Sequence, residues 1–275
     1  MCRLLGYLGS PVQLDQLLCQ PKNSLVVQAY QPKEMEVALM NADGFGIGWY
    51  HPKKETFPYI YKQVTPIWSD LNLTQISRYV EASCWLGYVR SATPGLAVDL
   101  SNCQPFSSEG LSLPRPLLFT HNGYVDRFRK TLYRPIRLSL NDDVYLHIQG
   151  TTDSEHIFAL ILHQLYTQPK LSLVQAVETA LNQLSDIAQA AGNVFFCANI
   201  VISDGQQLVA SRFASNAKAP SLYWLEDDPN YPDAVIIASE PLFEGNWKRC
   251  PEQSMIRVGE DGTVNTYQVA PRCYS

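Results

Sequence analysis

The sequence contains no long hydrophobic run. None of its apolar stretches approaches the ~20 residues that a membrane-spanning helix requires. The stretch 1–6 (MCRLLG) likewise has no apolar segment long enough for a secretory signal peptide. We therefore expect a cytoplasmic protein without a membrane partner.

Clusters of positive charge are also missing. The 21 Lys and Arg residues are outnumbered by 26 Asp and Glu, which gives a net charge of −5. Nucleic acids are bound mainly by basic side chains that neutralise phosphates, so we predict no nucleic-acid partner. A small anionic substrate remains compatible with this balance, because a single buried Arg can hold a carboxylate.

The cysteines lack the spacings of metal and redox sites. The sequence has no C-x-x-C and no Cys/His pair at zinc spacing, so we predict no metal ion and no cofactor. Cys84 and Cys197 lie in apolar runs and are predicted to be small core residues. The seven cysteines stand at positions 2, 19, 84, 103, 197, 250 and 273.

No internal repeat, low-complexity segment or linker divides the chain. The hydrophobic patterns give strands, then helices, then strands again, which predicts an α+β layered fold in one domain, residues 2–275. Thr152 and Glu155 form a capping-box pattern ahead of the first of two amphipathic helices, and the second covers 173–187. A short helix is predicted at 12–18, another helix at 67–82, and a loop at 91–116. Strands are predicted at 3–8, 47–51, 59–64, 84–90, 117–121, 194–203, 207–213, 222–225, 235–239, 256–258 and 264–269, with hairpin turns at 204–205 and 261–262.

Cys2 is a candidate nucleophile because of its position. Aminopeptidases remove an initiator Met1 that precedes a small residue, and the product carries a thiol and a free α-amine on one residue. These groups ordinarily titrate near ~8.5 and ~7.7–8.0, so a neutral amine can take the thiol proton at neutral pH. Taken alone, the dipeptide Met-Cys is more often a coincidence than a catalytic signature.

Arg90 follows a predicted strand and opens the segment Arg90-Ser-Ala-Thr-Pro-Gly95. An Arg at a strand end can bind a substrate carboxylate with both arms of its guanidinium, and Thr93 adds a hydroxyl nearby. A surface Arg at the start of a loop is the simpler alternative.

Asn122 and Gly123 follow the strand that ends at His121. The Asn amide and the Gly backbone N–H are the two donors that an oxyanion hole needs, about 3 Å from the developing negative oxygen. The alternative is a hairpin turn, because Asn-Gly is the strongest short hairpin signal.

Asp153 stands in the first turn of the first amphipathic helix. The helix dipole favours a carboxylate there, which is a sufficient structural explanation. The functional alternative is that this carboxylate binds a substrate ammonium group.

Together these segments resemble the class II glutamine amidotransferases, which belong to the N-terminal-nucleophile hydrolases. Cys2, the Arg90 segment, His121-Asn-Gly123 and Thr152-Asp-Ser-Glu155 come in the order of that family, and residues 41–50 resemble its DGxGxGWY segment. Gln104-Pro105-Phe106 also fits. Residues 238–242, Trp247 and Pro251 resemble the small stand-alone subgroup, which includes the ergothioneine-pathway γ-glutamyl hydrolase and the amidase subunit of the yeast glutathione-degradation complex.

The resemblance implies a four-layer αββα sandwich and a role for each motif. Cys2 would be the nucleophile with its own amine as base, and Asn122 and Gly123 would form the oxyanion hole. Arg90 with Thr93 would bind the glutamyl α-carboxylate, and Asp153 the α-ammonium. His121 we take to be structural.

Three functions follow as hypotheses. The first is hydrolysis of a γ-glutamyl thiol–histidine conjugate, γ-glutamyl-hercynylcysteine sulfoxide, in ergothioneine biosynthesis. The second is a glutaminase or glutathione-type γ-glutamyl hydrolase that works with a partner subunit. The third is an inactive binding protein of the same fold. Each involves a small γ-glutamyl molecule, and either a homo-oligomer or a partner subunit is compatible with the sequence.

Overall fold

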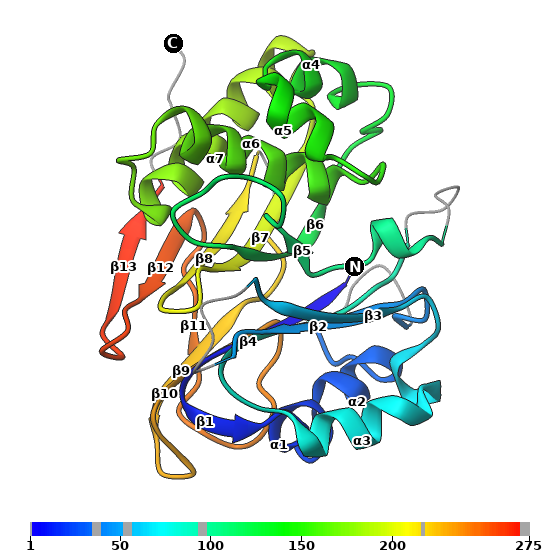
Figure 1. Cartoon of the computed structure of the whole chain (residues 1–275), viewed down its shortest axis with the longest axis vertical. Coiled ribbons are helices and arrows are strands. Elements are labelled where there is room, and N and C mark those ends of the chain that lie inside the picture. Colours follow the sequence, from blue (N-terminus) through cyan, green and yellow to red (C-terminus); the bar gives the residue numbers. More distant parts are fainter. Residues whose placement is uncertain (1, 35–39, 52–56, 93–97, 216–217, 270–275) are drawn as a thin grey trace.

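A computed structural model describes residues 2–34, 40–51, 57–92, 98–215 and 218–269 (Figure 1). Their strands form two antiparallel sheets, as the family resemblance implied, and the order strands–helices–strands correctly predicted an α+β fold. The first sheet has the order β11-β9-β10-β1-β4-β2-β3 and the second β13-β12-β8-β7-β6-β5. The strands of the first sheet are β1 (Arg3–Gln13), β2 (Phe45–Trp49), β3 (Tyr59–Gln63), β4 (Glu81–Val89), β9 (Tyr223–Asp228), β10 (Tyr231–Ala238) and β11 (Lys248–Arg249). Those of the second are β5 (Phe106–Ser107), β6 (Leu118–Val125), β7 (Phe196–Ser203), β8 (Leu208–Ala214), β12 (Ser254–Val258) and β13 (Val264–Gln268).

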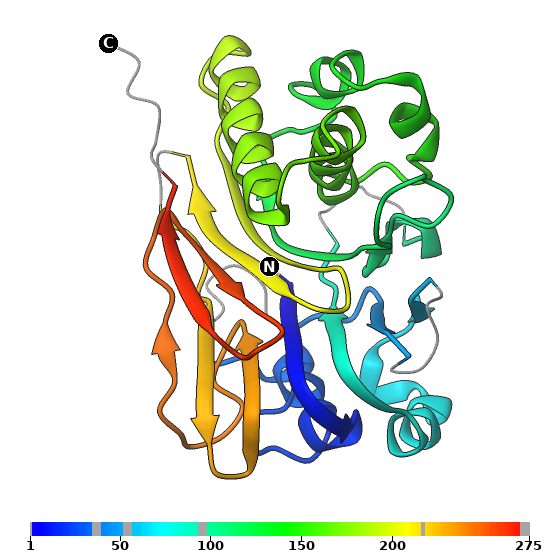
Figure 2. The same cartoon turned by 60° about the vertical axis from the view of Figure 1, so that its left-hand side comes forward.

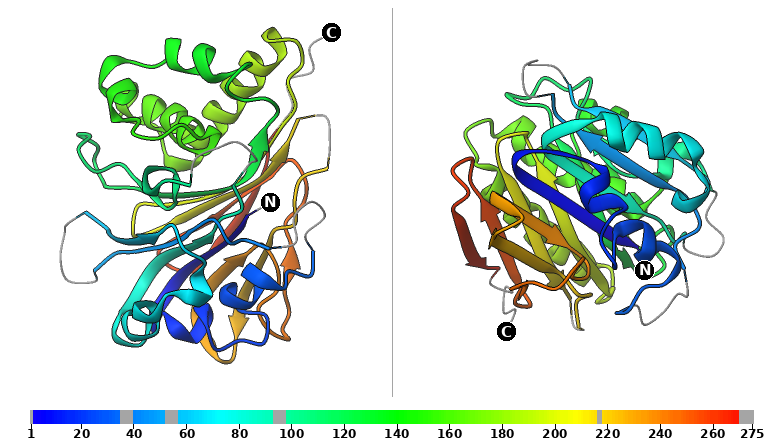
Figure 3. Two further views of the ribbon diagram at one scale, coloured as in Figure 1. Left: turned by 90° about the vertical axis from the view of Figure 1, so that its right-hand side faces the viewer. Right: turned by 90° about the horizontal axis from the view of Figure 1, so that it is seen from below.

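The helices lie on the two outer faces of the paired sheets (Figures 1 and 3). One layer covers the first sheet with α1 (Asp15–Leu18), α2 (Leu25–Tyr30) and α3 (Leu71–Tyr79), and the other covers the second sheet with α4 (Tyr133–Leu138), α5 (Asp142–His147), α6 (Asp153–Thr167) and α7 (Leu173–Ala190). This is the predicted αββα sandwich. No helix within these described ranges is both long and apolar enough to cross a membrane.

Three apolar clusters fill the spaces between the four layers. One lies between the second sheet and α6 and α7, another between the first sheet and α1–α3, and the third between the sheets. Along β1 the side chains alternate between the cluster under α1–α3 and the cluster between the sheets. Leu5 and Tyr7 face the helices, whereas Cys2, Leu4 and Leu8 face the opposite sheet.

The start of the chain is therefore placed inside the molecule. β1 pairs with β4 on one side and with β10 on the other, so it is a central strand. It crosses β6 and β7 of the second sheet, and Figure 2 shows its amino-terminal end beside the strands of that sheet. Cys2, which directly precedes β1, thus lies at the junction of the two sheets.

Several predicted boundaries were wrong because neighbouring strands and caps override local pattern. The predicted helix 12–18 is reduced to α1, since Val12 and Gln13 extend β1 and pair with the first residues of β4. The predicted helix 67–82 splits at Asp70, whose side chain caps Asn72 and Leu73, so that a 3₁₀ turn (Ile67–Ser69) precedes α3. The predicted loop 91–116 contains another 3₁₀ turn (Leu100–Asn102) and the short β5.

The capping box ahead of α6 is half formed. The Thr152 side chain accepts the Glu155 N–H, as predicted. The Glu155 carboxylate does not return to Thr152 but accepts the N–H groups of Gln149 and Gly150 at 2.8 and 2.7 Å. The acidic side chain thereby fixes the loop that enters the helix.

The hairpin alternative for Asn122-Gly123 is wrong. β6 runs through both residues and pairs Asn122 with Asn199 and Gly123 with Ala198 of β7. The two predicted Asp-Gly turns are real: they join β7 to β8 and β12 to β13, and their glycines have φ angles of 89° (Gly205) and 74° (Gly262).

Candidate active site at the junction of the sheets

Cys2 has a buried thiol that contacts the backbone just beyond β4. Its side chain is 8% exposed and belongs to the cluster between the sheets. The Ser91 N–H points at Sγ from 3.4 Å, and the Ser91 carbonyl oxygen lies 3.6 Å from Sγ. The sulfur therefore has one donor and one acceptor beside it.

Arg90 lies next to Cys2 because the strand ladder brings it there. Arg3 pairs with Val89 across β1 and β4, so the residues before Arg3 and after Val89 are adjacent. The Arg90 backbone is held by Gly44, and its Nη1 donates to the Asp43 carbonyl at 3.3 Å. The Asp43 carboxylate also accepts the Ala92 N–H at 2.8 Å. The segment 41–50, which resembles the family's DGxGxGWY motif, therefore supports the backbone that follows β4. Thr93 lies outside the described residues.

Asn122 brings an amide into the space between the sheets from β6. The residue is fully buried, and neither Nδ2 nor Oδ1 has a hydrogen-bond partner among the described residues. Buried polar groups are usually paired, and an unpaired one costs about 1–3 kcal/mol. An amide left in this state has both its donor and its acceptor free for a ligand.

Gly123 is fixed by the lack of room for a side chain. A Cβ there would lie 1.9 Å from the Cys197 carbonyl oxygen and 2.5 Å from Nε2 of His121. On the other edge of β6, the Gln104 side chain bonds both the N–H and the carbonyl of His121, at 2.5 and 3.2 Å. This double contact explains the Gln-Pro-Phe segment, because it holds the strand that carries Asn122.

Asp153 connects the first turn of α6 to the end of β6. Its Oδ2 accepts the Val125 N–H and its Oδ1 the Ser154 N–H, both at 2.8 Å. The helix cap is supplied by Thr152, so Asp153 is not the capping residue. The Ser154 hydroxyl also lies 3.4 Å from Oδ1, whereas Oδ2 keeps a second lone pair, which leaves the group able to bind a cation.

Tyr88 is the residue around which these groups meet. Cys2, Arg90 and Asp153 all act electrostatically on its hydroxyl. Burial raises the pKa of the Tyr88 hydroxyl well above its ordinary value and Cys2 adds to the rise, so the hydroxyl stays protonated. Sequence reasoning missed Tyr88, although side chains two apart on a strand share a face and Tyr88 precedes Arg90 by two.

His121 is structural, as predicted. Nε2 donates to the Cys197 carbonyl at 3.0 Å, and Nδ1 accepts from the Ser154 hydroxyl at 2.8 Å. Burial lowers the pKa of the imidazole, so the ring is neutral. Both ring nitrogens are thus occupied by contacts within the fold.

The other buried cysteines differ from Cys2 in their surroundings. Burial raises the pKa of Cys84 to about 12, of Cys197 to about 11 and of Cys250 to about 12. These thiols are core residues, as predicted for Cys84 and Cys197. Within the described ranges no group of three His, Cys, Asp or Glu side chains could hold a metal ion.

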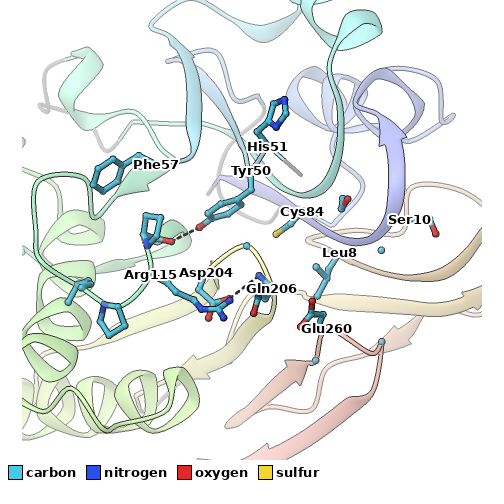
Figure 4. A pocket seen from close by; sticks show the side chains of 18 of the residues that line it. Leu8, Ser10, Tyr50, His51, Phe57, Cys84, Arg115, Asp204, Gln206 and Glu260 are labelled. Carbon is cyan, nitrogen blue, oxygen red and sulfur yellow. Dashed lines mark hydrogen bonds between the residues drawn. The ribbon is translucent and has the colours of Figure 1, made fainter. Parts of the chain in front are cut away.

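A large cavity lies elsewhere, around the far end of β1 (Figure 4). It has a volume of about 1300 Å³ and is lined by Leu8, Tyr50, Cys84 and Asp204, among others. Tyr50 donates to backbone carbonyls of Pro116 and Ser203. Because Leu8 is six residues from Cys2 along an extended strand, roughly 20 Å, this cavity is separate from the cluster around Tyr88.

Comparisons with known proteins give matches in both sequence and fold. A family model described as "Glutamine amidotransferases class-II" matches residues 1–223. The chain is 28% identical over 299 residues to the probable glutamine amidotransferase DUG3 of Saccharomyces cerevisiae, covering 94% of this chain and 82% of that protein. It is 27% identical over 267 residues to a gamma-glutamyl-hercynylcysteine sulfoxide hydrolase of Mycolicibacterium smegmatis, covering 97% and 99%. A solved structure of a glutamine aminotransferase class-II domain protein from Silicibacter pomeroyi superposes with a TM-score of 0.69 at 24% identity, covering 98% of this chain and 100% of that chain, and so shows the same fold.

Proposed function

Because the chain belongs to the class II glutamine amidotransferases, a family of amidohydrolase-type enzymes, we propose that it hydrolyses a γ-glutamyl amide with Cys2 as nucleophile. The observation that carries the proposal is the buried Asn122 amide, which has no hydrogen-bond partner among the described residues and lies at the sheet junction with the Cys2 thiol. An amide in this state is suited to a charge that exists only during reaction.

The chemistry begins with removal of Met1, which gives Cys2 a free α-amine. The neutral amine takes the thiol proton, and the thiolate attacks the γ-carbonyl carbon of the substrate. The carbonyl electron pair moves onto oxygen, where the Asn122 amide and the Gly123 N–H stabilise it. The carbonyl then re-forms, the C–N bond breaks, and the α-ammonium returns its proton to the leaving nitrogen. Water hydrolyses the resulting γ-glutamyl thioester by the same proton path and releases glutamate.

Substrate selection rests on two charges at the far end of the glutamyl group. Arg90 binds the α-carboxylate, with Thr93 as the predicted second contact, and Asp153 binds the α-ammonium. Arg90 directly follows β4 and Asp153 begins α6, so each charge is placed by a regular element. Both act on the hydroxyl of Tyr88, which supports their facing one substrate pocket.

As substrate we propose γ-glutamyl-hercynylcysteine sulfoxide, a thiol–histidine conjugate from which hercynylcysteine sulfoxide would be the leaving group. The support is the mycobacterial-type relative of that name, which this chain matches over 99% of its length. The similarity to DUG3 keeps a glutamine-type substrate as a second candidate. We place the reaction in the cytoplasm, where thiols stay reduced, since the described cysteines are all free.

The proposal is tested by a hydrolysis screen with the processed enzyme. The panel contains glutamine, glutathione, γ-glutamyl-cysteine conjugates and γ-glutamyl-hercynylcysteine sulfoxide, with released glutamate as the readout. We expect turnover of the last substrate to exceed that of glutamine by at least about tenfold in kcat/KM. Cys2→Ala should abolish turnover, whereas Cys84→Ala should keep it. No glutamate release from any member, or release that survives Cys2→Ala, would refute the proposal.

A further inference from the structure

A buried ion pair lies directly behind the nucleophile, on the other face of β1. Arg3 is 0% and Glu240 1% exposed, and Arg3 Nε lies 2.9 Å from Glu240 Oε1. The neighbours of Arg3 on this face, Leu5 and Tyr7, pack into the apolar cluster beneath the helices. Desolvating two charges costs several kcal/mol per ion, and an apolar pair usually packs as well or better. Packing alone therefore does not account for this pair.

The pair holds the backbone of Cys2. Arg3 Nη1 donates to the Cys2 carbonyl oxygen at 3.0 Å, while Nε of the same guanidinium binds Glu240. Glu240 is itself fixed from the opposite side by the N–H groups of Lys33 and Glu34, at 2.9 and 3.0 Å. The carbonyl of Cys2 is thus tied through two buried side chains to the segment that follows α2.

The next residue of β1 is held by the neighbour of Glu240. The Leu4 N–H donates to the Ser239 hydroxyl at 3.0 Å, and the Ser239 N–H donates to the Leu4 carbonyl at 3.1 Å. Ser239 and Glu240 together form one cradle for the first residues of β1. Only the Arg3–Glu240 part of this cradle touches Cys2.

A chain that begins at Cys2 needs such a support. A terminal residue has no preceding peptide bond to restrain it, and chain ends usually fray. Here the 2–3 peptide group is fixed by Arg3, and the thiol is fixed by the Ser91 N–H. These anchors lie on either side of Cα, so the direction of the α-amine relative to the thiol follows from them.

We propose that Arg3 and Glu240 are positioning residues that hold the Cys2 peptide group so that its α-amine and thiol are aligned for proton transfer and attack. This inference rests on the proposed function, because it concerns the same nucleophile. Neither side chain touches the substrate, so the pair acts on the rate of chemistry and not on substrate affinity. A misplacement of about 1 Å at a reacting group can cost on the order of 100-fold in rate.

The decisive variant is the double substitution Arg3→Met with Glu240→Leu, which removes both charges and leaves neither unpaired. We expect the melting temperature to be maintained or raised, KM to stay within about threefold, and kcat to fall 10- to 100-fold. Arg3→Lys is the second variant: one ammonium cannot bind Glu240 and the Cys2 carbonyl with the geometry of the planar fork, so kcat should fall at least about tenfold. The rate of Cys2 alkylation by iodoacetamide at pH 7 should fall in parallel in both variants.

Arg212→Met is the matched control. Arg212 is also buried, and it also binds backbone carbonyls, those of Ala219, Pro220 and Cys250, but not that of Cys2. We expect it to lower the melting temperature while kcat and alkylation stay within about threefold.

Two results would overturn the inference. One is a folded double variant with kcat and alkylation within about threefold of wild type; if that variant does not fold, the same result for Arg3→Lys decides. The other is a loss of kcat in the Arg212 control equal to that in the Arg3 variants. Failure of the proposed function looks different: the wild type would then hydrolyse no γ-glutamyl amide, while alkylation of Cys2 would still report on the pair.

Discussion

In the proposed mechanism, Arg90 and Asp153 are the side chains that distinguish a γ-glutamyl hydrolase from a general cysteine hydrolase. We predict that Arg90→Lys and Asp153→Asn each lower kcat/KM for a γ-glutamyl substrate by at least about 30-fold, which corresponds to the lower end of the 2–5 kcal/mol typical of a desolvated charge left unpaired. Because the two contacts also set the direction of attack, part of the loss should appear in kcat. Steady-state kinetics measure both constants.

Arg137→Lys is the control for that experiment. Arg137 is a half-buried Arg on α4 that bonds His156 and plays no part in the proposed pocket. It should keep kcat/KM within about threefold. If Arg90→Lys and Asp153→Asn also keep kcat/KM within about threefold of wild type, the substrate is not γ-glutamyl.

Replacing Asn122 should lower activity strongly while changing stability little. Asn122→Ala removes an oxyanion donor, so we predict a 10²- to 10³-fold fall in kcat. The same change removes a buried amide without a partner among the described residues, which offsets the lost packing, so the melting temperature should change by no more than a few degrees. Kinetics and calorimetry on one preparation test both halves.

Asn199, which lies opposite Asn122 on the neighbouring strand β7, is the matched control for the Asn122→Ala experiment. It pairs with Asn122 in β6–β7, but its Nδ2 donates to the carbonyls of Pro220 and Ser221 at 3.0 and 3.2 Å. Asn199→Ala therefore breaks satisfied hydrogen bonds and should lower the melting temperature clearly more than Asn122→Ala, with a much smaller effect on kcat. The reverse pattern would mean that Asn122 has a structural role.

Among the elements, α6 carries a buried histidine that makes folding sensitive to acid. His156 Nδ1 donates to the Thr152 carbonyl at 2.7 Å, and Nε2 accepts from Arg137 at 2.9 Å, so the ring must be neutral. Burial lowers its pKa from 6.5 to about 4, and Arg137 adds to the decrease. The unfolded chain binds this proton first as pH falls, so the stabilising contribution is present above pH 6.5 and is lost as pH falls towards 4.

We predict that the melting temperature falls between pH 6.5 and 4 and that His156→Gln flattens part of this decrease. The drop in pKa corresponds to roughly 3 kcal/mol of stability at neutral pH. His121 adds in the same direction, because burial also lowers its pKa. His147→Gln is the control and should keep the wild-type profile. An unchanged slope in the His156 variant would disprove the assignment.

Elements with a clear period were predictable, and short ones were not. The two amphipathic helices and most strands follow from spacing, since α7 repeats its apolar face over 18 residues. By contrast α2, α4 and α5 have only six residues each, too few turns for a helical period to stand out. The turn expected as an alternative at Asn122-Gly123 is replaced by strand because β7 offers a continuous partner.

Long-range contacts explain what the sequence could not indicate about the candidate site. Cys2, Arg90, Asn122 and Asp153 could be selected because each stands at a recognisable motif in family order. Arg3 and Glu240 could not, since they are 237 positions apart and only the pairing of β1 with β10 joins them. Tyr88 is intermediate: strand alternation places it beside Arg90, but nothing local relates it to Cys2.

At the scale of the whole molecule, the candidate site draws on three of the four layers. Cys2 and Arg90 come from the first sheet, Asn122 and Gly123 from the second, and Asp153 from the helices above it. Every described residue of the three apolar clusters that hold these layers together stays in the chain when Met1 is removed. The fold should therefore be independent of whether Met1 has been removed, whereas the chemistry should depend on it entirely.

Two preparations that differ only at the amino terminus separate the dependence of the fold on Met1 from that of the chemistry. One retains Met1, and the other begins at Cys2 after cleavage by a protease that cuts in front of it; intact mass verifies each. We expect equal melting temperatures, because the buried core is the same, and hydrolysis of the γ-glutamyl substrate only by the form that begins at Cys2, because only there does an α-amine next to the thiol exist to accept its proton. Carrying Cys2→Ala through the same cleavage controls for an effect of the protease treatment. Full turnover by the form that retains Met1 would rule out the α-amine as the base, and the proton acceptor would then have to be sought among the groups around Tyr88.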